Sequence, residues 1–285
     1  MKATKIMASL IVLINTACTS TAAQNAKLGE NGALRYWAAF GQMQDAAITP
    51  SQAKEINGML DGTLPYDDSK FNEIVEKNRP AIEIMQSGTA IPNCDWGLDY
   101  KRGPDEPVDY VRKALALGRL NVLYAFHQSV TGDKDGTVKT LVTGLRFSRD
   151  VANGGTLFAT LVAKDLLTTH FRAIEFVLKA DGLSSPQRRE LQKALTQLSR
   201  TQLDWRSAIQ RELGIDRKLA VQPSLQRVTQ AYVSALDNPS ALPQVQQMIA
   251  ALPQGLRELI PNPKRVVEEK EDFGAKLERV QLAFR

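Results

Sequence analysis

Histidine and cysteine are scarce in this 285-residue sequence, which contains two of each. Zinc sites and hydrolase triads rely heavily on these residues, and no HExxH, Glu-x-x-His or Cys-x-x-Cys pattern occurs. G-x-S-x-G elbows, phosphate-binding glycine loops and dinucleotide fingerprints are missing as well. The sequence therefore predicts neither a metal nor a cofactor, and it carries no positive sign of enzymatic activity.

The sequence also lacks massed charge and long apolar runs. Its 36 Lys and Arg residues are interleaved with 31 Asp and Glu residues, which leaves a formal net charge of +5. A nucleic-acid groove needs a basic patch or stripe, so no nucleic-acid partner is predicted. The apolar run from 6 to 14 is too short to span a bilayer as a permanent helix.

That short run belongs to a three-part pattern at the start of the chain. Lys2 and Lys5 precede it, and a segment of small and polar residues follows up to Ala23. This layout is typical of a secretory signal, so we interpret residues 1–23 as a signal peptide and expect a periplasmic or extracellular protein. Cleavage would leave 285 − 23 = 262 residues and, without the two lysines, a charge of +3.

A competing interpretation concerns Cys18, which would be the lipid-modified first residue of a lipoprotein. Thr16-Ala17-Cys18 fits the end of a lipobox, although Asn15 stands where that motif has an aliphatic residue. The protein would then contact the membrane only through this lipid. Under either interpretation Cys94 is the only free thiol expected in the mature chain, because Cys18 is removed or carries the lipid, so no internal disulfide is expected.

Apolar residues recur at helical spacing from 108 to 178. Three helices are predicted: about 108–130, a second between the turn at 131–136 and the glycines at 154–155, and about 156–179. The third is apolar around most of its circumference, and one narrow row is left for water: Asp165, Thr168, Arg172, Glu175 and Lys179. We therefore predict an all-α fold of helical hairpins around a central helix at 156–179, in a core domain spanning 24–182.

The segment before this core predicts further helices. One spans about 31–47 with Tyr36, Trp37 and Phe40 facing inward, and the next opens at Thr49-Pro50. A third helix begins at Asp67 or Asp68 and should kink or split at Pro80. A loop rich in Gly, Pro, Asp and Asn follows at 87–107.

Residues 183–285 contain fewer large apolar residues and many prolines, which predicts a second helical part, either a subdomain or an arm. Its last helix carries an apolar stripe of less than three heptads. We therefore expect this helix to dock on the body of the chain and not to form a coiled coil.

Several short motifs support a resemblance over residues 30–180. They are Ala33-Leu34-Arg35-Tyr36-Trp37, Cys94-Asp95-Trp96-Gly97, Leu145-Arg146-Phe147-Ser148-Arg149 and the Gly-Gly-Thr-Leu at 154–157. With these motifs the chain resembles a group of exported helical bacterial proteins for which no activity is known. The hairpin around 131–136 is also similar to a tetratricopeptide hairpin, but it lacks that repeat's signature positions and its 34-residue period.

Three residues are weak catalytic candidates: Cys94, His127 and His170. A histidine beside a cysteine generates thiolate, so Cys94 with either imidazole would make a thiol hydrolase pair. The apolar neighbours of both histidines favour hydrogen-bonded core residues instead, and we expect Cys94 to pack beside Trp96.

Three arginines are candidates for a structural ion pair or for an anion-binding site. Arg119 stands at helical spacing from apolar residues, so we expect it to find a carboxylate or carbonyl partner. Asp95 and Asp150 are the candidates, and the pair would link the Cys94 loop to the core. The alternative is an anion-binding site built from Arg112, Arg119 and Arg146.

Two functions follow from this sequence. The leading hypothesis is a non-enzymatic interaction or scaffold module of the cell envelope, whose helical hairpins present a surface to another envelope protein or to the cell wall. The alternative is a small hydrolase or ligand-binding protein that uses the Cys94 loop with an Arg/His cluster. We further expect Trp96 to be buried against the 108–130 helix.

Overall fold

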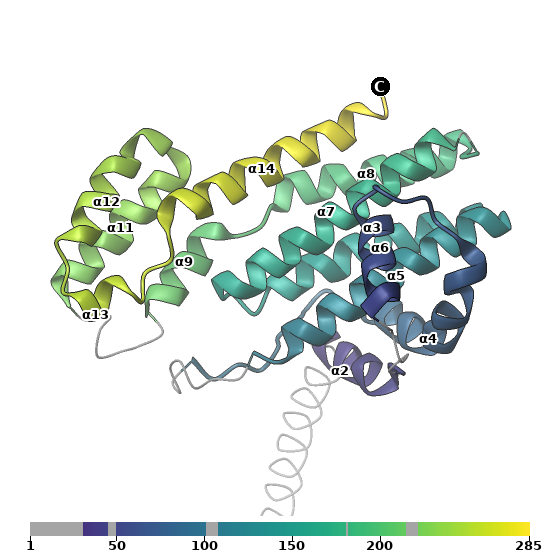
Figure 1. The fold of residues 1–285 in the computed structure, drawn as a ribbon, viewed down its shortest axis with the longest axis horizontal. Helices are drawn as coiled ribbons and strands as arrows, with labels where there is room; N and C mark the ends of the chain where they lie inside the picture. The colour runs from purple at the N-terminus through teal and green to yellow at the C-terminus, as the bar shows by residue number, and fades with distance from the viewer. Residues whose placement is uncertain (1–30, 45–49, 101–107, 181, 215–221) are drawn as a thin grey trace, which may run out of the picture.

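A computed structural model describes residues 31–44, 50–100, 108–180, 182–214 and 222–285 (Figure 1). These residues form helices joined by turns and loops, and no strand occurs among them beyond an isolated bridge between Asn31 and Asn93. The all-α class is therefore confirmed. The predicted signal peptide at 1–23 and the alternative lipid site at Cys18 lie outside the described residues.

The middle of the molecule consists of α5 (Tyr110–Thr131), α6 (Lys134–Ala152) and α7 (Leu157–Lys179), as the sequence predicts. The turns between them follow from local chemistry. Gly132 ends α5 in the left-handed conformation at φ 89°, which glycine adopts without steric cost. Thr156 caps α7 by accepting a hydrogen bond from the backbone N–H of Ala159.

Helix α7 is central, because α5 and α6 pack along it and α14 (Pro263–Leu282) runs alongside it on another side (Figure 1). Its expected polar row is only partly right. Thr168 is buried, and Lys164, which the periodicity does not single out, is buried too, with 5% of its surface exposed. Two other members of the row form ion pairs with distant parts of the chain, Arg172 with Asp61 and Glu175 with Arg279.

The N-terminal helices are α2 (Gly32–Gln42), α3 (Pro50–Leu60) and α4 (Asp68–Gly88). Tyr36 and Phe40 face inward as expected, but Trp37 is 41% exposed, so its inward assignment is wrong. Neighbouring residues on a helix point about 100° apart, and the face shared by Tyr36 and Phe40 excludes Trp37.

Pro80 does not split α4, which continues through it. The missing N–H of Pro80 frees the carbonyl of Glu76, and both residues are exposed. Water can bond that carbonyl, so the helix tolerates the proline.

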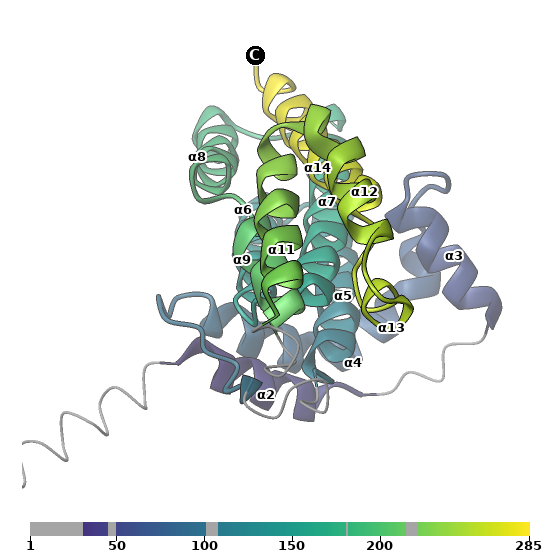
Figure 2. The same cartoon turned by 90° about the vertical axis from the view of Figure 1, so that its left-hand side faces the viewer.

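The C-terminal part contains α8 (Ser185–Thr201), α9 (Trp205–Gly214), α11 (Pro223–Asp237), η2 (Pro239–Ala241), α12 (Leu242–Ala250), α13 (Gln254–Arg257) and α14. Helix α8 packs against α6, and α9 and α14 pack against α7, whereas α11 packs on α9 and α14, and α12 packs on α11 and α14 (Figure 2). One apolar cluster runs through both parts of the chain, with only a small satellite at Val228, Leu252 and Leu256. Helix α14 docks on the body as expected, where Phe273 stacks on Phe171 at 5.9 Å.

Among the described residues, none of the helices combines the length and the hydropathy that crossing a membrane requires.

Candidate functional site

The loop after α4 is held by Trp96, which is 5% exposed. Its indole stacks on Tyr110, the first residue of α5, with 4.1 Å between ring centroids. The indole N–H donates to the backbone carbonyl of Asp150 at 2.8 Å, so the buried ring leaves no polar atom unpaired. The expectation that Trp96 packs against the 108–130 helix is confirmed.

Asp150 is the polar centre of this region. One of its carboxylate oxygens accepts from the Tyr36 hydroxyl at 2.6 Å, and the other accepts from Arg149 at 3.1 Å. Burial raises the pKa of Asp150, and the hydrogen bonds from Tyr36 and Arg149 partly oppose this rise. The carboxylate joins α2 to α6 and is fully engaged in doing so.

Cys94 lies beside Asp150 and is buried. Its thiol donates a weak hydrogen bond to the carbonyl of Asp150 at 3.8 Å between Sγ and O. Burial, followed by the negative charges of Asp150 and Asp95, raises the pKa of Cys94. Both influences disfavour thiolate, so this environment deactivates the thiol as a nucleophile. The expected packing of Cys94 near Trp96 agrees with this geometry.

His170 is fully buried on α7. Its Nδ1 lies 2.8 Å from the carbonyl of Leu166, which can only accept, so Nδ1 carries the hydrogen. Nε2 then accepts from the side-chain amide of Asn121 at 3.2 Å. Burial lowers the pKa of His170 to about 4. This is the hydrogen-bonded core histidine that the sequence favours.

Gly144 makes room for this pair. A Cβ atom at position 144 would lie 2.1 Å from Nε2 of His170 and 2.4 Å from the amide nitrogen of Asn121. Since real carbon contacts are far longer, only glycine fits between α6 and the ring. The imidazole is therefore enclosed by α5, α6 and α7.

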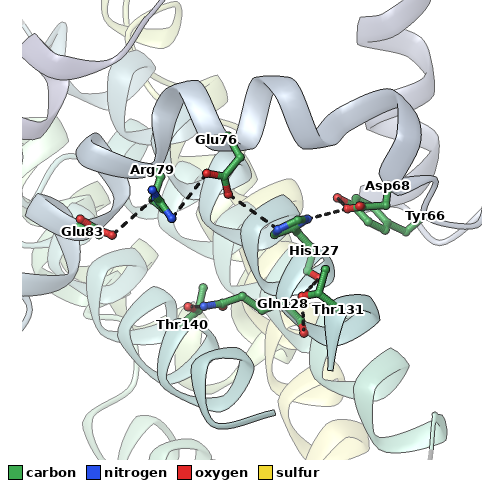
Figure 3. A network of polar contacts seen from close by, with 9 residues as sticks. All are labelled: Tyr66, Asp68, Glu76, Arg79, Glu83, His127, Gln128, Thr131 and Thr140. Atoms are coloured by element: carbon green, nitrogen blue, oxygen red, sulfur yellow. Dashed lines mark hydrogen bonds and ion pairs between the residues drawn. The ribbon is translucent and has the colours of Figure 1, made fainter. Parts of the chain in front are cut away.

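His127 differs from the expected core histidine, as Figure 3 shows. Its Nδ1 lies 2.7 Å from a carboxylate oxygen of Asp68, and its Nε2 lies 3.8 Å from a carboxylate oxygen of Glu76. Tyr66 donates its hydroxyl to the same oxygen of Asp68 at 2.9 Å. Burial, the hydrogen bond to Asp68 and the negative charges of Asp68 and Asp67 raise the pKa of Tyr66.

This His127 cluster joins α4 to α5, because Asp68 and Glu76 belong to α4 and the imidazole to α5. Helical spacing within 108–130 indicates only that His127 borders the core. Its carboxylates lie 59 and 51 residues earlier in the sequence (127 − 68 and 127 − 76), so no local pattern reveals them. Both ring nitrogens face carboxylates of the protein, which suits a clamp between helices better than a base aimed at a substrate.

The structure does not bring the catalytic candidates together. No hydrogen bond or ion pair within the described ranges connects Cys94 with either histidine, which have the separate partners given above. The Cys94 loop is described only up to residue 100, so its remainder at 101–107 lies outside the described residues.

The expected arginine pair is wrong. Arg119 is exposed on α5, and Asp95 accepts instead from the backbone N–H of Gly97 at 2.9 Å. A charge on an exposed face is hydrated, so it needs no carboxylate partner. Arg112 is likewise exposed on α5, whereas Arg146 lies on α6 in a groove with Arg149. The three arginines therefore do not form one anion site.

A separate groove of about 370 Å³ opens between the turn after α3, α5 and α7. Its walls carry Leu64, Tyr66, Phe126 and Phe176. Phe126 meets Phe176 edge-to-face at 5.1 Å and Tyr66 at 5.5 Å. We call this the aromatic groove. Helical periodicity does not reveal it, because Leu64 and Tyr66 belong to a turn and reach the helices only through the tertiary fold.

No cluster of three or more His, Cys, Asp and Glu residues suited to a metal ion occurs in the part of the chain that the structure describes. Comparison with protein-family models, curated proteins and solved structures finds no match, so the resemblance to exported helical bacterial proteins stays a prediction.

Proposed function

We propose that this chain is an exported, non-enzymatic interaction module of the cell envelope, which binds another envelope protein through the aromatic groove. The observation that carries the proposal is the exposure of large apolar side chains at that groove. Leu64 is 46% exposed and Phe176 is 40% exposed, and both line the same hollow. Single exposed apolar residues are ordinary, whereas a hollow lined with them is typical of a binding surface.

The groove also has the layout of an interface. Its apolar centre is bordered by the ion pair between Arg172 and Asp61, whose atoms lie 2.7 Å apart. Interfaces commonly combine an aromatic centre with such a polar rim. The occupant that suits this layout is a protein segment that inserts one large apolar side chain, leucine or aromatic, between Leu64 and Phe176.

The surroundings make the groove rigid. Tyr66 is anchored to Asp68, which also holds His127, so the wall of the groove is tied to α4 and α5. A surface that keeps its shape in the free protein loses little conformational entropy on binding. We therefore assign the His127 cluster a positioning role behind the groove.

Site-specific photo-crosslinking in intact bacterial cells tests this proposal. A photoreactive residue at position 176 should crosslink one envelope protein. The matched control is position 158, because Phe158 is also on α7 and 46% exposed but does not line the groove. The captured protein is then purified and its binding measured directly.

Wild-type protein should bind this partner, and Leu64→Ser with Phe176→Ser should weaken binding at least tenfold while Phe158→Ser leaves it unchanged. Equal crosslinking from positions 158 and 176, or unchanged binding by the groove variant, overturns the proposal. Export is tested separately by mass spectrometry of the mature N-terminus: Gln24 is expected after signal cleavage, and a lipid on Cys18 would support the alternative.

A further inference from the structure

A second groove, of about 550 Å³, lies between α6, α8 and the turn that follows α4. Its size falls within the range of small-molecule sites, which is roughly 300–1,000 Å³. It is separate from the aromatic groove, since the two share no lining residue. A ligand in this second groove would be additional to the proposed protein partner and would not require it.

Three cationic side chains line this second groove. Arg146 and Arg149 come from α6, one turn apart, and Lys193 comes from α8 on the opposite wall. Arg146 and Lys193 are exposed, and neither is in contact with a carboxylate of another described residue, although Arg146 is near enough to Asp150 for its charge to lower the pKa of that carboxyl. Unpaired cations on facing walls create a local positive potential that attracts an anion.

Arg149 adds directional donors. One terminal nitrogen of its guanidinium bonds Asp150, and a guanidinium has five N–H donors in a fixed fork. Asp150 accepts only one hydrogen bond from Arg149, because its other oxygen accepts from the Tyr36 hydroxyl. Arg149 therefore retains donors for a second anion in the groove.

The rest of the lining is mixed. Val142, Leu145 and Leu198 supply apolar atoms at the base, and the half-buried Ile91 and Ala194 extend this surface. Of the described residues that line the groove, Glu190 alone is acidic, and it is exposed. An inorganic anion would contact only the cationic side chains, and a neutral hydrocarbon would contact only the apolar residues. Neither ligand would therefore match the whole surface of the groove.

We propose that this groove binds a small amphiphilic anion: a carboxylate or phosphate attached to an aliphatic chain. The head group contacts Arg146, Arg149 and Lys193, and the aliphatic chain lies over Val142, Leu145 and Leu198. Both head groups are bidentate acceptors that suit arginine, and the experiment distinguishes them.

Isothermal titration calorimetry with octanoate, octyl phosphate, inorganic phosphate and 1-octanol tests this inference on the full mature chain. Binding of octanoate or octyl phosphate is expected to be at least tenfold tighter than binding of inorganic phosphate or 1-octanol. The tighter of the two amphiphiles identifies the preferred head group. If 1-octanol binds as tightly as the tighter of the two amphiphiles, charge is not recognised and the proposal is overturned.

Charge variants locate the site. Arg146→Ala with Lys193→Ala should weaken octanoate binding at least tenfold, since both cations are lost. Arg112→Ala with Arg119→Ala is the matched control: it removes the same charge from exposed positions on α5 and should leave the affinity unchanged. Glu190→Gln removes the repelling carboxylate, so affinity should rise about two- to threefold.

Each variant changes exposed residues, and circular dichroism verifies its fold. An equal loss in the control pair would show nonspecific attraction to a basic protein. An unchanged affinity in the Arg146/Lys193 pair would place the ligand elsewhere. Either result rejects the inferred site, whether or not the aromatic groove binds a protein.

Discussion

Lys164 is buried in an ion cluster with two carboxylates. We predict that removing the lysine and removing the carboxylates lower the free energy of unfolding by unequal amounts. The ammonium group of Lys164 lies 2.5 Å from a carboxylate oxygen of Glu269 and 2.7 Å from one of Asp272, both on α14. The side chain of Lys164 is only 7% exposed, whereas those of Glu269 and Asp272 are 27% and 42% exposed. Asp272 also keeps a second cation, Lys276, at 2.7 Å.

Replacing Lys164 by methionine removes the buried charge and retains most of the side-chain volume. The two carboxylates regain water, and Asp272 keeps Lys276, so the free energy of unfolding should fall by only about 1 kcal/mol or less. Replacing Glu269 and Asp272 together by alanine removes both carboxylates that contact the buried ammonium group of Lys164. This loss should reach about 3 kcal/mol, the lower part of the range for breaking a buried pair.

The triple variant with methionine at 164 and alanine at 269 and 272 provides the sharpest comparison. No charge is stranded in it, so we expect it to be about 2 kcal/mol more stable than the double alanine variant. Urea unfolding followed by circular dichroism and tryptophan fluorescence measures all four proteins, and coincident transitions justify the free energies. A triple variant no more stable than the double one would refute this reasoning.

Three further predictions concern the interior. Trp96→Ala should lower the free energy of unfolding by about 3–5 kcal/mol in urea titrations, whereas Trp96→Phe, which keeps a ring, should lose less; equal losses would contradict the stacking account. Cys94 should react slowly with iodoacetamide in native protein at about pH 8 and rapidly in denaturant, because burial raises its pKa; rapid native labelling would show an open loop. Since the folded pKa of His170 is lower than its unfolded value of 6.5, stability is full above that value and falls as the pH decreases towards about 4. Relative to His170→Asn, wild-type protein should lose about 2 kcal/mol between about pH 7.5 and pH 5, and parallel pH profiles would exclude a buried neutral imidazole.

The helical framework is readable from local sequence because local interactions determine it. The left-handed Gly132 and the capping Thr156 fix helix ends through their own backbone and side-chain chemistry. Apolar spacing then identifies α7 as the most deeply packed helix. Trp96 is predictable for a similar reason, since a large aromatic residue in a loop is costly to leave in water.

The ionic contacts are not readable in the same way. Lys164 looks like a surface lysine until α14 covers it, and the acids that neutralise it lie 105 and 108 residues later (269 − 164 and 272 − 164). Arg119 shows the opposite error: apolar neighbours at helical spacing do not establish burial, because the boundary of a buried face depends on which helix packs there. The two grooves are unpredictable for the same reason, because each is lined by segments that lie far apart in the sequence and meet only in the folded chain.

The position of α14 also has a kinetic consequence. Phe273 fills a seam beside Phe171 on α7, and roughly one hundred residues separate these partners (273 − 171 = 102). Closing such a long loop slows folding, since its entropy is lost before the contact forms. Until that happens, α7 presents an uncovered apolar seam. We therefore expect the chain to be exposed to proteases and to self-association until α14 has docked on α7.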